Sequence, residues 1–166
     1  MKVFVLLTRV PYPLEKGDKL RAYHFIRLIS QKHEVVLCAL NDQKELHPQT
    51  LPVLKQFCKD IHIINIKKTS VLFNIGQAFF NETPLHLGYF WNTPAFFEIQ
   101  RLIDFHKPDH IFCQLIRMAE YVKHIELPKT IDYQDVFSTG IKRRQKLAPF
   151  WMKPFFGLEY ERLKQY

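Results

Sequence analysis

Apolar positions along the chain form two kinds of pattern, short apolar runs and apolar residues at helical spacing. Short apolar or alternating runs predict strands, whereas apolar residues that recur every three or four positions predict helices. The first pattern predicts strands at residues 2–8, 34–40, 60–66, 109–115 and 130–135. The second predicts helices at residues 18–31, 47–58, 71–80, 94–106 and 155–166. Strands alternating with helices predict a parallel sheet covered by helices on both faces, a Rossmann-like, doubly wound α/β fold.

The loops at the carboxyl ends of the predicted strands are the first places to look for a ligand. In doubly wound sheets, ligands bind beyond these strand ends. The loops in question begin at Arg9, Ala39, Lys67, Gln114 and Gln134.

Length and composition indicate a single domain without a membrane span. The 166 residues are 47% hydrophobic, which is enough to bury a core. No apolar run reaches the roughly 18 residues that a membrane-spanning helix needs. The apolar start MKVFVLLT is followed directly by Arg9, Pro11 and Pro13, which is unlike a signal peptide. We therefore expect a cytoplasmic protein.

The C-terminal segment predicts a final helix that is incomplete. Residues 155–166 have the spacing of an amphipathic helix, but no Gly, Asn or Pro ends it. We therefore expect residues 1–166 to form one domain of a longer protein, truncated in its last helix.

The chain carries none of the common cofactor or catalytic fingerprints. The loop after the first predicted strand holds one glycine, Gly17, so neither the dinucleotide-binding GxGxxG nor the P-loop GxxxxGK[ST] is present. GxSxG, HExxH and CxxC are also absent. Cys38, Cys58 and Cys113 are widely spaced among apolar neighbours, which predicts core thiols rather than a disulfide framework or a zinc site. We therefore expect no bound cofactor and no metal.

The most informative stretch is the first strand-to-helix loop, TRVPYPLEKGDKLRAYHF. Gly17 stands just before the predicted helix, where a side chain would keep an anion from the backbone, and Asp18 is a candidate N-cap. Lys19 and Arg21 lie in the first turn, where cations do not help the helix dipole but suit a docked phosphate. The alternative is a tight turn with two solvated cations.

Four segments resemble a known enzyme family. KGDKLRAYHF, PLHLGYFWN, QLIRMAEYV and DYQDVFS are similar to family 4 retaining glycosyltransferases, especially the bacterial subgroup tied to exopolysaccharide and exosortase loci. The resemblance covers essentially the whole chain. It implies the N-terminal, acceptor-side half of a GT-B fold, with the donor-binding half following in sequence. The whole enzyme would transfer a sugar from a nucleotide-sugar to a lipid-linked or polysaccharide acceptor, and this half alone would be inactive.

The resemblance also implies roles for individual residues. It makes Gly17 a contact to the donor pyrophosphate or to the acceptor, with Lys19 and Arg21 as contacts to a phosphate or an acceptor. Many family members place a histidine after the fourth strand, near the reacting carbon. Here Gln114 stands at that point. Its amide can hydrogen-bond a sugar hydroxyl but cannot change charge as an imidazole does.

Two further groups have both a functional and a structural interpretation. Arg117 is either a site residue or a helix-start cation paired with Glu120. Asp132 and Asp135 end the fifth predicted strand, and residues three apart on a strand point to opposite faces, so they do not form a catalytic pair. Asp135 either orients an acceptor hydroxyl or caps a helix that starts directly after it.

The positive charge is concentrated near the C-terminus. Of the formal net charge of +8, residues 139–166 carry +5, since seven Lys and Arg stand against two Glu. Such a segment favours an anionic partner. IKKTSVLFNIGQAFF and GIKRRQKLAPFWMKPFF also place aromatic residues beside the cations, which is typical of an interfacial membrane contact. The predicted membrane-facing residues are Lys142, Arg143, Arg144, Lys146 and Trp151.

The basic segment leaves two alternatives to a membrane-associated enzyme. In the first, its aromatic residues belong to the core and its charges are solvated, a common arrangement in globular proteins. A second alternative is a non-catalytic Rossmann-like module that docks on a membrane or a partner through the basic tail. A nucleic-acid partner is not expected, because the segment lacks a recognition helix or a stacking motif of the usual kinds.

Overall fold

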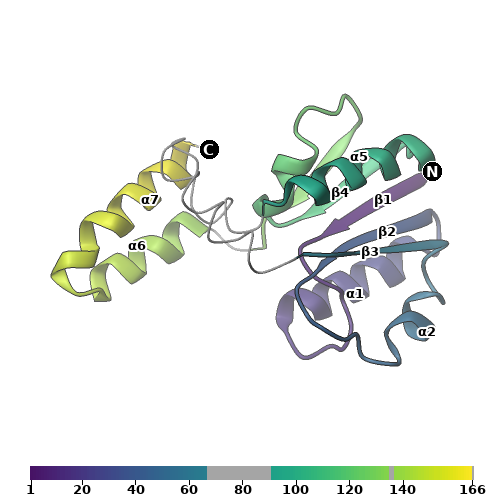
Figure 1. The fold of residues 1–166 in the computed structure, drawn as a ribbon, viewed down its shortest axis with the longest axis horizontal. Helices are drawn as coiled ribbons and strands as arrows, with labels where there is room; N and C mark the ends of the chain where they lie inside the picture. The colour runs from purple at the N-terminus through teal and green to yellow at the C-terminus, as the bar shows by residue number, and fades with distance from the viewer. Residues whose placement is uncertain (67–90, 135–136, 166) are drawn as a thin grey trace.

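Five strands form one sheet in which every strand pairing is parallel, as the sequence predicts. The computed structural model describes residues 1–66, 91–134 and 137–165. The strand order is β3-β2-β1-β4-β5 (Figure 1). In chain order, the elements are β1 (Lys2–Leu7), α1 (Gly17–Ile29), β2 (Glu34–Asn41), α2 (Thr50–Leu54), β3 (Asp60–Asn65), α5 (Thr93–His106), β4 (His110–Gln114), the 3-10 helix η1 (Ile116–Tyr121), β5 (Lys129–Asp132), α6 (Phe137–Leu147), the 3-10 helix η2 (Phe150–Met152) and α7 (Lys153–Gln165).

The three central strands, β1, β2 and β4, are buried on both faces, which explains why they are almost continuous apolar runs. Successive side chains of a strand point to opposite faces. In β1, Phe4 and Leu6 pack toward α5 and η1, whereas Val3, Val5 and Leu7 pack toward α1 and α2. Figure 1 shows α5 on one side of the sheet and α1 and α2 on the other. The molecule therefore has the doubly wound arrangement expected from the sequence.

Helix α5 shows how local sequence sets an element boundary. The Asn92 side chain caps its N-terminus by accepting a hydrogen bond of 2.9 Å from the Ala95 N–H, and a proline stands in the first turn. The helix ends at Lys107, whose left-handed backbone (φ 46°) closes the last turn by donating to the Ile103 carbonyl. The predicted span of this helix, 94–106, is close to the observed one.

One predicted helix differs from the structure, and two further helical elements are present. The helix expected at 47–58 is reduced to α2, because Pro48 and Pro52 lack the backbone N–H that a continuous helix uses. η1 and α6 were not among the predicted elements, but a helix that starts at Arg117 and one that starts after Asp135 were the structural alternatives for those two residues. The helix predicted at 71–80 and the residue Asp135 lie outside the described residues.

The three cysteines lie in the core, as predicted. Cys38 and Cys113 pack on the α5 face of the sheet, and Cys58 packs on the α1 face. All three thiols are free and buried. Burial raises the pKa of each thiol to about 12, so none is a nucleophile near neutral pH.

Candidate functional site at the carboxyl edge of the sheet

The order of the strands reverses between β1 and β4. From β1 the chain adds β2 and β3 on one side, and then returns to place β4 and β5 on the other. In open α/β sheets, ligands bind at such a reversal, beyond the carboxyl ends of the strands. The loop from β1 to Gly17 and the segment that begins at Leu115 therefore border the position where a ligand is expected.

Helix α1 is attached to the end of β4 by a buried amide. The Nε2 of Gln114 donates a hydrogen bond of 2.8 Å to the backbone carbonyl of Asp18, and only 2% of Gln114 is exposed. The Asp18 carboxylate accepts from the Lys19 N–H at 3.0 Å and lies 3.4 Å from the guanidinium of Arg9. Gln114, expected to face a sugar hydroxyl, thus has its amide engaged within the protein.

A second attachment joins α1 to the end of β5. Arg21 forms a two-pronged ion pair with Asp132, with Nε–Oδ2 at 2.8 Å and Nη2–Oδ1 at 3.0 Å. Asp132 is the register partner of Gln114 across the β4–β5 pair. The first turns of α1 are therefore fixed to two neighbouring strand ends. From the sequence, Asp132 was considered only as a possible catalytic pair with Asp135 and was assigned no role. In the structure its partner is Arg21, a cation on α1.

Gly17 is the first residue of α1, and neither the backbone conformation nor the packing at this position requires a glycine. The N-cap is Lys16, which makes no side-chain capping bond, so the expectation that Asp18 is the N-cap was wrong. Asp18 instead lies within the first turn. A Cβ added to Gly17 would meet nothing within 4 Å, and no glycine described has a positive φ. The space beside Gly17 is therefore open to a ligand.

Lys19 is buried rather than exposed to a ligand. Only 4% of it is accessible, and its Nζ lies 3.0 Å from the carboxylate of Glu15 one helical turn earlier. The hydrogen bond and charge of Lys19 lower the pKa of Glu15. A phosphate that reached Lys19 would therefore compete with a carboxylate already in place.

Leu115 has a backbone conformation that is unusual for a residue with a side chain. Its φ of 69° and ψ of 147° lie close to a region that is almost restricted to glycine. The residue is buried, and its N–H donates to the Asp132 carbonyl at 2.8 Å. Such conformations cost on the order of 1–3 kcal/mol and cluster at functional sites. This backbone strain at Leu115 lies where the strand order reverses, and no sequence pattern predicts it.

The remaining predicted residues lie further along the chain. Arg117 is in η1 and is partly buried, while Glu120 pairs with Lys123 at 2.7 Å. A helix does begin at Phe137, as the capping alternative for Asp135 requires, but Asp135 itself is outside the described residues. Among the residues that the structure describes, no three His, Cys, Asp or Glu side chains are grouped so that they could hold a metal ion.

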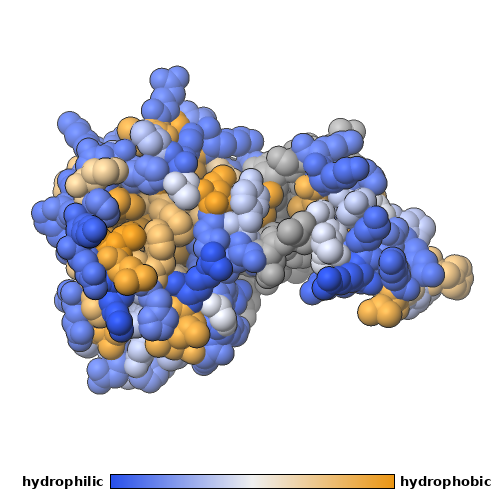
Figure 2. All heavy atoms as spheres, turned by 180° about the vertical axis from the view of Figure 1, so that it is seen from behind, coloured by the Kyte–Doolittle hydropathy of each residue, from blue (hydrophilic) through white to orange (hydrophobic). Residues whose placement is uncertain are grey.

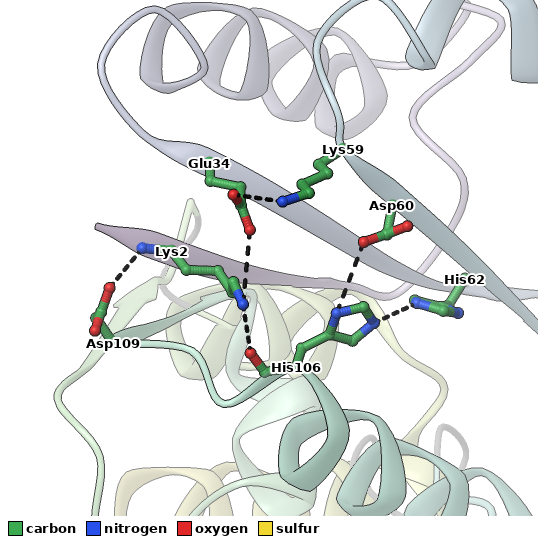
Figure 3. Close-up of polar contacts among 7 residues, drawn as sticks. All are labelled: Lys2, Glu34, Lys59, Asp60, His62, His106 and Asp109. Atoms are coloured by element: carbon green, nitrogen blue, oxygen red, sulfur yellow. Dashed lines mark hydrogen bonds and ion pairs between the residues drawn. The ribbon is translucent and has the colours of Figure 1, made fainter.

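A histidine pair lies at the opposite, amino edge of the sheet (Figure 3). The Nε2 atoms of His62 and His106 are 2.8 Å apart, and Nδ1 of His106 is 3.7 Å from the carboxylate of Asp60. Burial, followed by the charge of His106, lowers the pKa of His62. A hydrogen bond between two imidazole nitrogens needs one N–H donor and one nitrogen without a proton.

The same edge is tied together by ion pairs that Figure 3 also shows. Lys2 bonds through its backbone N–H to Asp109 at 2.6 Å and through its ammonium to the His106 carbonyl at 2.7 Å. Glu34 lies 2.8 Å from Lys59 and 3.6 Å from Lys2. These contacts join the starts of β1, β2 and β3 to the end of α5, which indicates a role in stability.

The predicted membrane-facing residues lie on the hairpin of α6 and α7. Lys142, Arg143, Arg144, Lys146 and Trp151 are all exposed. Figure 1 shows this hairpin to one side of the sheet. None of the described helices combines the length and the apolar character that crossing a bilayer requires.

The carboxyl edge thus combines one open backbone position, a buried amide that fixes α1, and three ion pairs. The resemblance to family 4 glycosyltransferases stays a prediction, because the chain matches no protein-family model and no curated protein.

Proposed function

We propose that this chain is the acceptor-side half of a sugar-transferring enzyme of GT-B architecture, with a donor-binding half following in the same polypeptide. The observation that best supports the proposal is the open position of Gly17 at the carboxyl edge, beside the reversal of strand order. Ligands of open α/β sheets bind at that point. The four segments that resemble family 4 glycosyltransferases are the second line of support.

The charge balance of the edge favours the hydroxyl groups of an acceptor over a free phosphate. Three cations near the start of α1 are each matched by a carboxylate, in the pairs Arg9–Asp18, Lys19–Glu15 and Arg21–Asp132. A matched pair offers a donor and an acceptor to a hydroxyl but little net charge to an anion. The diphosphate of the nucleotide-sugar is therefore bound chiefly by the other half.

In the transfer, the bond between the anomeric carbon and the donor phosphate oxygen breaks. A bond from the same carbon to the acceptor oxygen forms on the face from which the phosphate departs, as retention requires, and the acceptor proton passes to the departing phosphate oxygen. This half contributes by holding the hydroxyl beside that face of the carbon, an effect of position rather than of chemistry. Gln114 has no titratable group and its amide is engaged with Asp18, so it positions α1 and takes no proton.

The test is a transfer assay with the complete polypeptide. The enzyme is incubated with labelled nucleotide-sugars and with lipid-linked acceptors extracted from membranes, and label in the lipid fraction is measured. Gly17→Val should lower turnover by about 100-fold, because the new side chain displaces the acceptor. Gly140→Val is the matched control, since a Cβ at Gly140 also meets nothing within 4 Å but lies on α6 rather than on α1.

Two results would contradict the proposal. If Gly17→Val folds normally and transfers sugar like the wild type, the open edge is not the acceptor site. If no nucleotide-sugar is consumed with any acceptor, the alternative of a non-catalytic binding module takes its place.

A further inference from the structure

The hairpin of α6 and α7 is a local unit with its own packing. The two helices contact each other. Ile141 on α6 and Leu163 on α7 are buried. The turn is held by two hydrogen bonds, from Gln145 Nε2 to the Lys153 carbonyl at 3.1 Å and from the Met152 N–H to the Pro149 carbonyl at 2.9 Å. The side chains at the turn are therefore presented on a defined scaffold.

Large apolar side chains stand exposed at the tip of this hairpin. Leu147, Phe150 and Trp151 are 88%, 85% and 68% exposed. Phe155 and Leu158 on α7 are also exposed. Figure 2 shows apolar side chains gathered at the end of the hairpin that lies farthest from the sheet. A group of exposed apolar residues of this kind marks a contact surface.

The same segment contains no acidic residue over a long stretch. Between residues 136 and 158 there are five Lys and Arg and no Asp or Glu. Arg143, Arg144 and Lys146 are exposed on α6 just before the tip, and Lys153 is exposed just after it. Apolar side chains at the apex are thus flanked by cations on both helices, and this charge favours an anionic partner.

From this arrangement we infer that the tip of the α6–α7 hairpin inserts shallowly into the headgroup region of a bilayer that contains anionic lipid. Trp and Phe are side chains that the membrane interface accommodates, and Trp is enriched there. The flanking cations are placed to meet lipid phosphates while the apex enters the acyl boundary. A nucleic acid would match the charge but would leave Leu147 without a partner, since an aliphatic side chain does not stack on bases as an aromatic ring does.

The inference is independent of the sugar-transfer proposal and is tested on the 166-residue chain alone. The chain is mixed with vesicles of phosphatidylcholine, with or without phosphatidylglycerol, and binding is measured by co-sedimentation. We expect binding only to the anionic vesicles. It should weaken at about 1 M salt, where the Debye length falls to about 3 Å. Trp151 emission should shift to the blue and be quenched by lipids brominated near the headgroup.

Two variants separate the electrostatic and apolar parts of the contact. Each basic residue near an anionic surface strengthens binding by about fivefold, so changing Arg143, Arg144 and Lys146 to Glu should weaken it by at least about 100-fold. The double change Phe150→Ser and Trp151→Ser should also release the chain from the vesicles, although it leaves every charge in place.

The matched control changes Lys32, Lys44 and Lys55 to Glu, three exposed lysines of the sheet domain. Each reversal removes two units of charge, so both triple variants lower the formal net charge of +8 to +2. If the two triple variants lose binding equally, net charge and not the hairpin governs it, and the inference is wrong. It is equally wrong if wild type ignores anionic vesicles at low salt, or if the Phe150 and Trp151 double variant binds like wild type.

Discussion

Replacing Gln114 by Glu tests whether this side chain holds α1 from a buried position. The wild-type amide donates to the Asp18 carbonyl at 2.8 Å with 2% of the residue exposed. A carboxylate in the same place cannot donate, and burial disfavours its charge. The protonated carboxyl, by contrast, can donate its O–H to that carbonyl. The variant should therefore resemble wild type only when the new group keeps its proton.

The magnitude follows from the shift in pKa that burial imposes. A Glu carboxyl has a pKa of about 4.3 in the unfolded chain, and full burial raises it by up to about 3–5 units. Because the folded-state pKa is raised, the unfolded state loses its proton first, and stability falls as pH rises above about 4.3. A rise of about three units gives a loss of about 4 kcal/mol, complete above about pH 7.

The assay is urea denaturation followed by circular dichroism, with variant and wild type compared at each pH so that background titrations cancel. Gln100→Glu is the matched control. Gln100 also donates to a backbone carbonyl, that of Tyr121 at 2.7 Å, but it is partly exposed and His124 lies beside it. That variant should show little pH dependence. If the free energy of unfolding of Gln114→Glu differs from that of wild type by a constant amount between about pH 5 and pH 8, Gln114 does not hold α1 from a buried position.

Four further changes have defined outcomes. Tyr121→Phe should lower the free energy of unfolding by about 1–3 kcal/mol in urea denaturation, because the buried Asn92 N–H loses the hydroxyl it donates to at 2.9 Å; an unchanged midpoint would contradict this. Gly140→Ala should raise it by about 0.5–1 kcal/mol, since the new methyl meets nothing. Gly157→Ala should gain less, because its Cβ would lie 2.8 Å from Gln145 Nε2 and displace that amide from the Lys153 carbonyl. His62→Gln should flatten the stability profile below about pH 6.5. The pKa of His62 is lowered in the folded state, so the unfolded state takes up a proton first and wild-type stability is lost as pH falls; parallel profiles for variant and wild type would exclude this.

The strands were predictable from sequence because their signal is local and physical. A strand buried on both faces must be apolar at every position, so runs such as that of β1 are visible without knowledge of their neighbours. Gly17, the first residue of α1, was also visible, since a lone glycine where a loop meets a helix is a local feature. The strand order was not, but alternation with helices restricts it to few topologies.

The details of the site depend on contacts that no local pattern records. Arg21 and Asp132 are 111 positions apart, and Gln114 and Asp18 are 96 apart. Lys19 was expected to contact a phosphate or an acceptor, with a solvated cation as the alternative, but its side chain is buried and pairs with Glu15. The backbone conformation of Leu115 is set by the packing of η1 and by the hydrogen bond from its N–H to the Asp132 carbonyl of β5. Neither can be predicted from the local sequence.

The burial of the cysteines makes the chain suitable for site-selective labelling. With a pKa of about 12, each native thiol is almost entirely protonated at neutral pH, and a maleimide reacts only with the thiolate. A cysteine introduced at an exposed position such as Phe150 should therefore be the single reactive site on the folded protein. An environment-sensitive dye attached there reports directly on the polarity around the hairpin tip, with the three native cysteines left unchanged.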